Sequence, residues 1–240
     1  DWVSAWTTLQ DHIQKRFRTG AMFSYSSNVY ITRGSMWEAI RNQGHDLILW
    51  IDDDNVLTHA QFDMLVADLD AHPELDGVVG WCWANGAEDA KISCGNFVPN
   101  TNLPLNVPFK YPEISGYHED LIPIQWSGFP VVLLRGSVMQ KAGQLPFTPI
   151  LVPNVSWGMT GEDVSFFFNA MTRGKARFCV DRRVKVPHLK LRPVEPSSPD
   201  LFTSNHGVRI ETRVEPNAQS ESDGTSVIGH MSVVGTLNDS

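Results

Sequence analysis

Three consecutive aspartates, Asp52, Asp53 and Asp54, directly follow the apolar run LILWI at residues 47–51. Carboxylates clustered at the end of a buried strand are typical ligands of a hard cation such as Mg²⁺ or Mn²⁺. The carboxyl end of a strand in an open α/β sheet is also where ligands bind. A solvated acidic turn that begins the next helix, with Asn55 and Thr58 as caps, would have the same composition. The triplet alone leaves both interpretations open.

A second acidic pair, Glu162 and Asp163, stands at the start of a helical pattern, and His188 follows in the segment VPHLK. Paired carboxylates at a helix N-terminus are usually caps that the helix dipole favours. A carboxylate can also accept a proton as a general base, and near a helix N-terminus we expect it to keep a low pKa and stay ionised. A single histidine is most often a surface or capping residue.

Two known carboxylate motifs fit the triplet incompletely. An EF-hand loop beginning at Asp52 needs Gly at its sixth position and Glu at its twelfth, where this chain has Leu57 and Asp63, so the loop is excluded. Phosphohydrolases of the haloacid dehalogenase type begin with an apolar strand and Asp-x-Asp-x-Val/Thr, which Asp52, Asp54 and Val56 resemble, with Asp52 as nucleophile. The segment GEDVSF lacks that family's second late Asp, and two elements precede the strand, so this remains the lesser alternative.

Three segments together resemble GT-A glycosyltransferases of the family-2-like kind. Residues 33–54 are similar to the pattern "ARN … YLLFLDDD", which contains the DxD motif. WSGFPVVLLRGSVMQKAG resembles "GxGFxLIRRxVFxKxG", and TGEDVSFFFNAMTRGKARFCVDRRVKVPHLK resembles "GEDxxFxxRxxxxGxxxxxDxxxxxxHxK". A lone DxD is weak evidence, but three motifs in order over roughly residues 20–190 are specific. Gly34 replaces the usual Asn, which weakens the donor-contact assignment nearby. The family's first strand is absent, so either the N-terminus is truncated, as we expect, or recognition of the nucleobase is degraded.

The resemblance implies an α/β fold of the GT-A type, a Rossmann-like three-layer sandwich with a central, mostly parallel sheet, over residues 1–192. It implies a hexosyltransferase-type enzyme that moves a sugar from a nucleotide-diphosphate donor to an acceptor hydroxyl, with inversion. The acceptor is a glycan, lipid, protein or small molecule. Mn²⁺ or Mg²⁺ would be the cofactor. A non-catalytic GT-A-like module that only binds a glycan or a nucleotide is a further alternative.

The same resemblance assigns roles to individual residues. Asp54 is the strongest metal ligand expected. The other expected metal ligands are Asp52 and His188. The residues expected to bind the donor are Arg33, Asp52, Asp53 and Lys190. The expected catalytic base is Asp163, with Glu162 as second choice. The residues expected at the acceptor site are Trp126, Gly128 and Trp157.

Hydrophobic periodicity indicates the elements that position these residues. Helices are predicted at 3–17, 35–43, 59–71, 137–142 and 161–173, and strands at 21–31, 47–51, 77–84, 130–134, 176–180 and 184–190. This alternation is typical of a layered α/β domain. The unbroken apolar run at 47–51 is typical of a strand in a mostly parallel sheet. Residues 86–124 lack periodicity and are interpreted as a functional insertion. Residues 193–240 are polar and are interpreted as a tail or peripheral appendage.

The charge and the cysteines restrict the partners. The formal net charge is −8, yet residues 173–192 carry 8 of the 19 basic residues, which suits a small anionic ligand better than extended nucleic acid. No apolar run is long enough to cross a bilayer. The three cysteines are scattered, without CxxC spacing, so we expect no zinc site and a reducing, cytoplasmic location.

Overall fold

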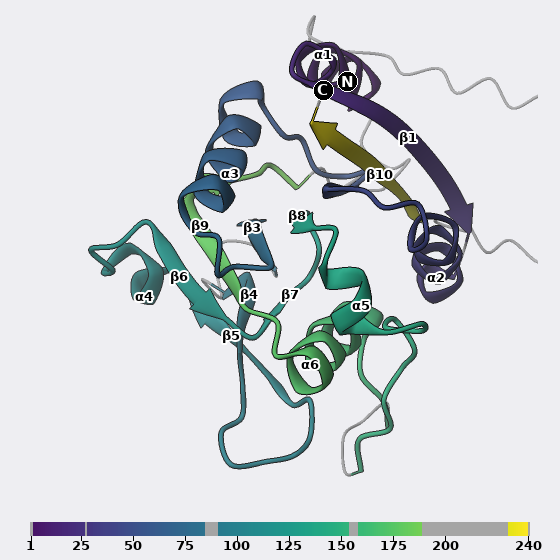
Figure 1. Cartoon of the computed structure of the whole chain (residues 1–240). Coiled ribbons are helices and arrows are strands. Elements are labelled where there is room, and N and C mark those ends of the chain that lie inside the picture. The colour runs from purple at the N-terminus through teal and green to yellow at the C-terminus, as the bar shows by residue number, and fades with distance from the viewer. Residues whose placement is uncertain (1, 27, 85–90, 154–157, 189–229, 240) are drawn as a thin grey trace, which may run out of the picture. The chain divides into compact units, whose positions relative to one another are not determined.

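The computed structural model describes residues 2–26, 28–84, 91–153, 158–188 and 230–239 (Figure 1). Two sheets organise them. The larger has the strand order β1 (Phe17–Ser26), β10 (His230–Asp239), β2 (Leu47–Asp52), β8 (Val131–Arg135), β3 (Gly77–Trp81), β9 (Phe178–Lys185) and β6 (Leu121–Ile124). The smaller has the order β5 (Asn106–Lys110), β4 (Lys91–Phe97) and β7 (Trp126–Ser127).

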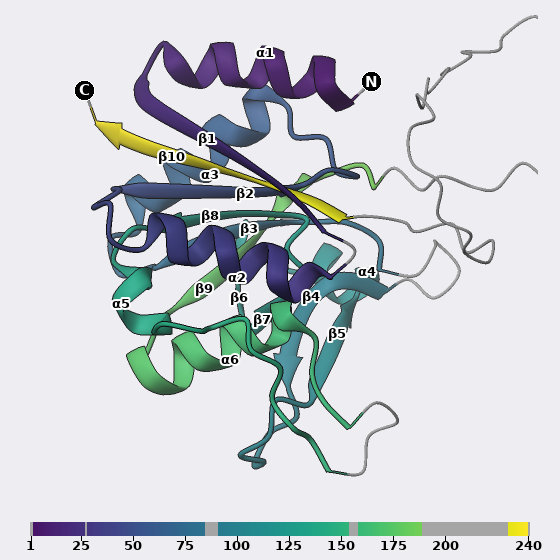
Figure 2. The ribbon, with the colours of Figure 1, turned by 90° about the vertical axis from the view of Figure 1, so that its right-hand side faces the viewer.

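Helices cover both faces of the larger sheet. One apolar core joins α1 (Trp2–Gln14) and α3 (His59–Ala71) to Leu49 and Ile51 of β2. The opposite core joins α2 (Val29–Ile40), α5 (Val138–Ala142) and α6 (Glu162–Gly174) to Ile48 and Trp50. The short helix α4 (Tyr111–Ser115) follows β5. Figure 2 shows α1 above the sheet and α6 below it. Successive residues of β2 therefore face opposite cores, which explains its unbroken apolar sequence.

The α/β class is confirmed, but the expectation of a mostly parallel sheet is wrong. The described sheet is mixed and mostly antiparallel, with one parallel pair, β3 with β9. The reason is that β8 runs antiparallel between β2 and β3, and β10 does so between β1 and β2. An apolar run reports burial on both faces and says nothing about the direction of neighbouring strands. β2, β3 and β9 nevertheless point the same way.

Several element predictions hold and others change. The helix predicted at 59–71 is α3, whose N-cap Thr58 forms a capping box with Gln61. The strand predicted at 21–31 is wrong in its second half, because Asn28 caps α2, which begins at Val29. The piece predicted at 176–180 and the start of the piece predicted at 184–190 belong to one strand, β9, which ends at Lys185. Residues 86–124 contain β4, β5, α4 and β6.

The C-terminal segment differs from the expected tail where it is described. Residues 230–239 form β10, which pairs along its length with β1 and, through residues 232–237, with β2. Part of the segment assigned to an appendage thus belongs to the central sheet. Within the part of the chain that the structure describes, no helix combines the length and the hydropathy needed to span a membrane.

Candidate functional site

A cavity of about 390 Å³ lies where β2, β3 and β9 end. These three strands point the same way, so their carboxyl ends meet at one edge of the sheet, which is where open α/β sheets bind ligands. The residues predicted from sequence that line this cavity are Arg33, Asp52, Asp54, Trp126, Gly128, Glu162, Asp163 and His188. Asp53 is not among its lining residues. Lys190 and Trp157 lie outside the described residues.

Arg33 is the positive partner of two of these carboxylates. It extends from α2, is 3% exposed, and its Nη2 donates to both oxygens of Asp52 at 2.9 and 2.8 Å. Its Nη1 donates to Glu162 Oε1 at 2.6 Å, and its guanidinium lies 4.7 Å from the ring centroid of Phe129. Burial would lower the pKa of Arg33, but the charges of Asp52 and Glu162 outweigh burial and raise it. Arg33 therefore joins the first and third sequence motifs in one buried ion-pair network.

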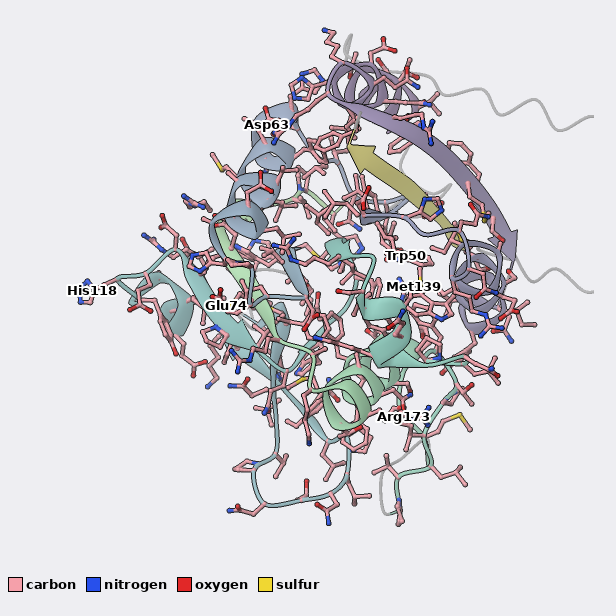
Figure 3. All side chains as sticks on the ribbon, in the orientation of Figure 1. Trp50, Asp63, Glu74, His118, Met139 and Arg173 are labelled. Carbon is pink, nitrogen blue, oxygen red and sulfur yellow. The ribbon has the colours of Figure 1, made fainter. Side chains whose placement is uncertain are left out.

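Phe129, beneath Arg33, has a strained backbone. Its φ of 61° lies in the left-handed region that bulky residues rarely adopt. Its ring is fully buried, and it contacts the rings of Trp50, Phe147 and Phe166. Figure 3 labels Trp50 in this interior, in contrast to the peripheral His118. The aromatic packing holds a backbone conformation that costs on the order of 1–2 kcal/mol.

Asp54 and His188 form a second pair in the cavity. His188 Nε2 lies 2.7 Å from Asp54 Oδ2, although the two residues are 134 positions apart. A backbone bridge between Asn55 and His188 holds the two segments together. Asn55 Nδ2 donates to Asp54 Oδ1 at 2.6 Å. The imidazole and the carboxylate are thus fixed side by side.

The donor set fits a divalent cation that a substrate completes. Among the described residues there is no group of three or more His, Cys, Asp or Glu side chains arranged to hold a metal. Because Mn²⁺ and Mg²⁺ prefer oxygen ligands, one carboxylate with one imidazole would hold either ion only together with phosphate oxygens and water. The oxygens of Asp52 already accept from Arg33. In this arrangement Asp54 and His188 are the residues that would hold the ion.

The pKa of Asp163 differs from the expectation for a helix N-terminus. It is raised to about 6, first by burial and then by the charge of Glu162, while Arg33 and the Val164 N–H act in the opposite direction. The expectation of a low pKa was wrong because the helix start faces a second carboxylate in a desolvated cavity. Among the described residues Glu162 pairs with Arg33, whereas Asp163 forms no ion pair. Asp163 Oδ2 lies 3.6 Å from the place that a Cβ on Gly128 would occupy.

We expect Asp163→Asn to stabilise the protein in a pH-dependent way. Because the folded pKa is raised, the contribution of this carboxyl to stability is present below pH 4 and is lost as the pH rises through about 6. The variant should therefore match the wild type at pH 4.5 more closely than at pH 7.5, where it gains on the order of 1–2 kcal/mol after allowance for solvent screening. Urea unfolding at the two pH values measures the difference.

Glu162→Gln is the matched control for this prediction. It removes one of the two carboxylates that neutralise buried Arg33, so it should lower the free energy of unfolding at pH 7.5. A pH-independent difference between Asp163→Asn and the wild type would contradict the raised pKa. At pH 7.5 the free energy of unfolding should rise in Asp163→Asn and fall in Glu162→Gln, which would distinguish the carboxylate without an ion pair from the one paired with Arg33.

Two aromatic side chains line the cavity among the described residues, the predicted Trp126 and a second, Trp83. Trp126 is only 6% exposed, and its Nε1 donates to the carbonyl of Asn96 at 3.2 Å, so most of its ring is in the core. Trp83, which the sequence analysis missed, lines the cavity and is half-buried. Its position just beyond the end of β3 is the signal that could have identified it. Lys185 Nζ lies 4.9 Å from its ring centroid.

Comparisons with known proteins add little to this geometry. No family model matches the chain, and no curated protein matches it. A solved structure described as "Crystal Structure of A197 from STIV" is similar at 13% identity and a TM-score of 0.43. The match covers 70% of this chain and 78% of that chain. A likeness at this level carries no argument about function, which rests on the site alone.

Proposed function

We propose that the chain is a metal-dependent glycosyltransferase with a GT-A-like fold that moves a sugar from a nucleotide-diphosphate donor to an acceptor hydroxyl, with inversion. One observation carries the proposal. Three sequence segments that resemble GT-A motifs, although far apart in the chain, line one cavity at the carboxyl ends of β2, β3 and β9. A volume of about 390 Å³ lies within the range of small-molecule sites.

Asp54 and His188 would hold Mn²⁺ or Mg²⁺, which when bound stabilises the negative charge that develops on the leaving diphosphate. The cavity already contains more carboxylates than cations, because its described lining has four carboxylates and Arg33 is its one Lys or Arg. That excess of negative charge opposes the binding of a bare diphosphate and favours the binding of a diphosphate complexed with a divalent cation. Arg33 keeps Asp52 and Glu162 in place while the donor binds.

Asp163 is suited to act as the base. As the acceptor oxygen attacks the anomeric carbon, the bond from that carbon to the diphosphate oxygen breaks, and a carboxylate oxygen of Asp163 accepts the hydroxyl proton. A pKa of about 6 leaves Asp163 ionised at neutral pH yet more basic than an ordinary aspartate. Glu162 is less suited to this role because it is held by Arg33 at 2.6 Å.

The phosphohydrolase alternative has less support from the geometry. It requires an Asp52 carboxylate that attacks phosphorus, but both oxygens of Asp52 accept hydrogen bonds from Arg33. These charge-assisted bonds lower the nucleophilicity of the carboxylate. The non-catalytic module differs from the enzyme only in turnover, so binding and turnover have to be measured separately.

Binding is tested by a thermal-shift panel of UDP-, GDP-, CMP- and dTDP-sugars, each with and without Mn²⁺. A donor at about 100 times its Kd stabilises the folded state by about 2.7 kcal/mol, which raises Tm by roughly 5–10 °C for a chain of this size. We expect this shift for one nucleotide class, and only with Mn²⁺. Equal shifts with and without the metal, or none with any donor, would contradict the proposal.

Trp83→Ala is expected to weaken acceptor binding. A sugar ring that stacks on the half-buried indole would lose about 0.5–1.5 kcal/mol, so the KM for the acceptor should rise by about two- to tenfold with kcat nearly unchanged. Steady-state kinetics with the donor saturating measures both constants. Tyr117→Ala, which removes an exposed aromatic from a different cavity, is the control and should leave KM unchanged. Equal effects of the two variants would rule out stacking on Trp83.

A further inference from the structure

The ring of His188 contacts a thiol on the side opposite Asp54. Cys82 follows β3 directly, and its Sγ lies 3.9 Å from His188 Nδ1. The other ring nitrogen, Nε2, lies 2.7 Å from Asp54 Oδ2. All three residues line the cavity. The imidazole therefore spans the distance between a carboxylate and a thiol, with one ring nitrogen directed at each.

The backbone on both sides of this contact is fixed. Cys82 N–H donates to Ser93 Oγ at 3.1 Å, and the Cys82 carbonyl accepts from Ser93 N–H at 2.9 Å. The backbone bridge between Asn55 and His188 holds the histidine from the other side. Cys82 itself is 5% exposed, so its side chain has little freedom.

The amide of Asn55, the residue after Asp54, is fixed in its orientation. Asn55 is 3% exposed, and its Oδ1 is buried without a hydrogen-bond partner among the described residues. Its Nδ2 donates to Asp54, so turning the amide over would place two oxygens against each other. A buried acceptor without a donor costs about 1–3 kcal/mol.

The Cys82 thiol can form a hydrogen bond with either neutral tautomer of the His188 ring. A neutral imidazole carries one proton. Without a cation, the contact with Asp54 places that proton on Nε2, and Nδ1 accepts from the Cys82 S–H. When Nε2 binds a cation, the proton moves through solvent to Nδ1, and this N–H donates to Sγ. A thiol can donate and accept, as a hydroxyl can, whereas a methyl group can do neither.

We propose that Cys82 is a positioning residue for His188, which keeps the ring oriented with Nε2 toward Asp54 and can accept from Nδ1 when Nε2 binds a divalent cation. The inference rests on the proposed metal-dependent function and adds a residue that the family resemblance does not assign. Partners on the far nitrogen of a metal-binding histidine typically contribute 10–100-fold to metal affinity. Loss of the Cys82 thiol should therefore weaken the metal site without removing a ligand.

Titration of the full chain with Mn²⁺ alone tests this inference, with free Mn²⁺ measured by its EPR signal. We expect Cys82→Ala to weaken Mn²⁺ binding by about tenfold or more. Cys82→Ser retains a donor and an acceptor and should stay within about threefold of the wild type. Cys94→Ala and Cys179→Ala remove buried cysteines that do not line this cavity, and they should leave the affinity unchanged.

A second readout follows the proton itself. In ¹⁵N spectra of the histidine ring, addition of Mg²⁺ to the wild type should move the His188 proton from Nε2 to Nδ1. Cys82→Ala should need a higher Mg²⁺ concentration for the same change. A purely structural loss, which would appear as a lower Tm in Cys82→Ala and Cys94→Ala alike, has no reason to change the tautomer in only one of them.

The outcomes separate this inference from the proposed function. If the wild type binds Mn²⁺ and Cys82→Ala binds it equally well, Cys82 has no positioning role and the proposed function is unaffected. Equal weakening by Cys82→Ala and Cys82→Ser would also overturn the inference, because it would indicate packing and not hydrogen bonding. If the wild type binds no Mn²⁺, the metal-dependent function fails and the role of Cys82 fails with it.

Discussion

Replacing Arg33 with Met is expected to lower the free energy of unfolding by about 3–5 kcal/mol, the largest stability effect that the site offers. Arg33 is almost fully buried and compensates both Asp52 and Glu162. Met fills a similar volume but leaves two desolvated carboxylates without their cation. Urea denaturation at pH 7.5 measures the loss.

Two further variants make this prediction specific. Arg16→Met breaks an ion pair with Asp70 in which both side chains are exposed, so it should cost less than about 1 kcal/mol. The triple variant Arg33→Met, Asp52→Asn, Glu162→Gln removes every charge of the buried network and should recover much of the loss. An Arg33→Met loss no greater than that of Arg16→Met would contradict the role assigned to Arg33.

Replacing Asp54 with Ala is expected to have the largest effect on activity, a loss of about 10³-fold or more in metal-dependent kcat/KM. Asp54 is the carboxylate fixed beside His188, whereas Asp52 of the same triplet is held by Arg33. Since Asp54 is partly exposed, the free energy of unfolding should change by only about 1 kcal/mol. Donor turnover as a function of Mn²⁺ concentration measures the effect.

Asp53→Ala is the matched control from the same triplet. Asp53 carries the same charge but does not line the cavity. We expect its replacement to reduce kcat/KM by less than tenfold, through the local potential and any contact with the donor sugar. Equal losses for Asp53→Ala and Asp54→Ala would mean that the triplet acts by its summed charge, and the assignment of Asp54 as the ligand would be wrong.

Sequence reasoning was strongest where one local pattern determines the outcome. The capping box of Thr58 and Gln61 fixes the start of α3, and the apolar run before Asp52 fixes β2. The position of Asp52 and Asp54 at a strand end suggested a ligand site as one of two interpretations, and both residues line the cavity. The ordered motifs also indicated that His188 would lie near the triplet, and the contact with Asp54 agrees with that prediction.

The features that sequence reasoning missed depend on partners distant in the chain. Strand direction follows from where β8 and β10 are inserted, which no property of residues 47–51 encodes. The raised pKa of Asp163 arises from burial and from Glu162 in the folded cavity, against the effect of the helix N-terminus. Trp83 and Cys82 belong to no motif and become functional candidates only through the position of β3.

The most direct test of the central claim is Mn²⁺-dependent release of nucleoside diphosphate from the sugar nucleotide that the thermal-shift panel selects. The wild type should release it only with the divalent metal, and kcat/KM should rise with pH to a plateau above about 6 as Asp163 ionises. Asp163→Asn should bind the donor normally but turn it over at least 100-fold more slowly. Wild-type turnover in Asp163→Asn, or release of phosphate from simple phosphomonoesters regardless of added sugar nucleotide, would contradict the account.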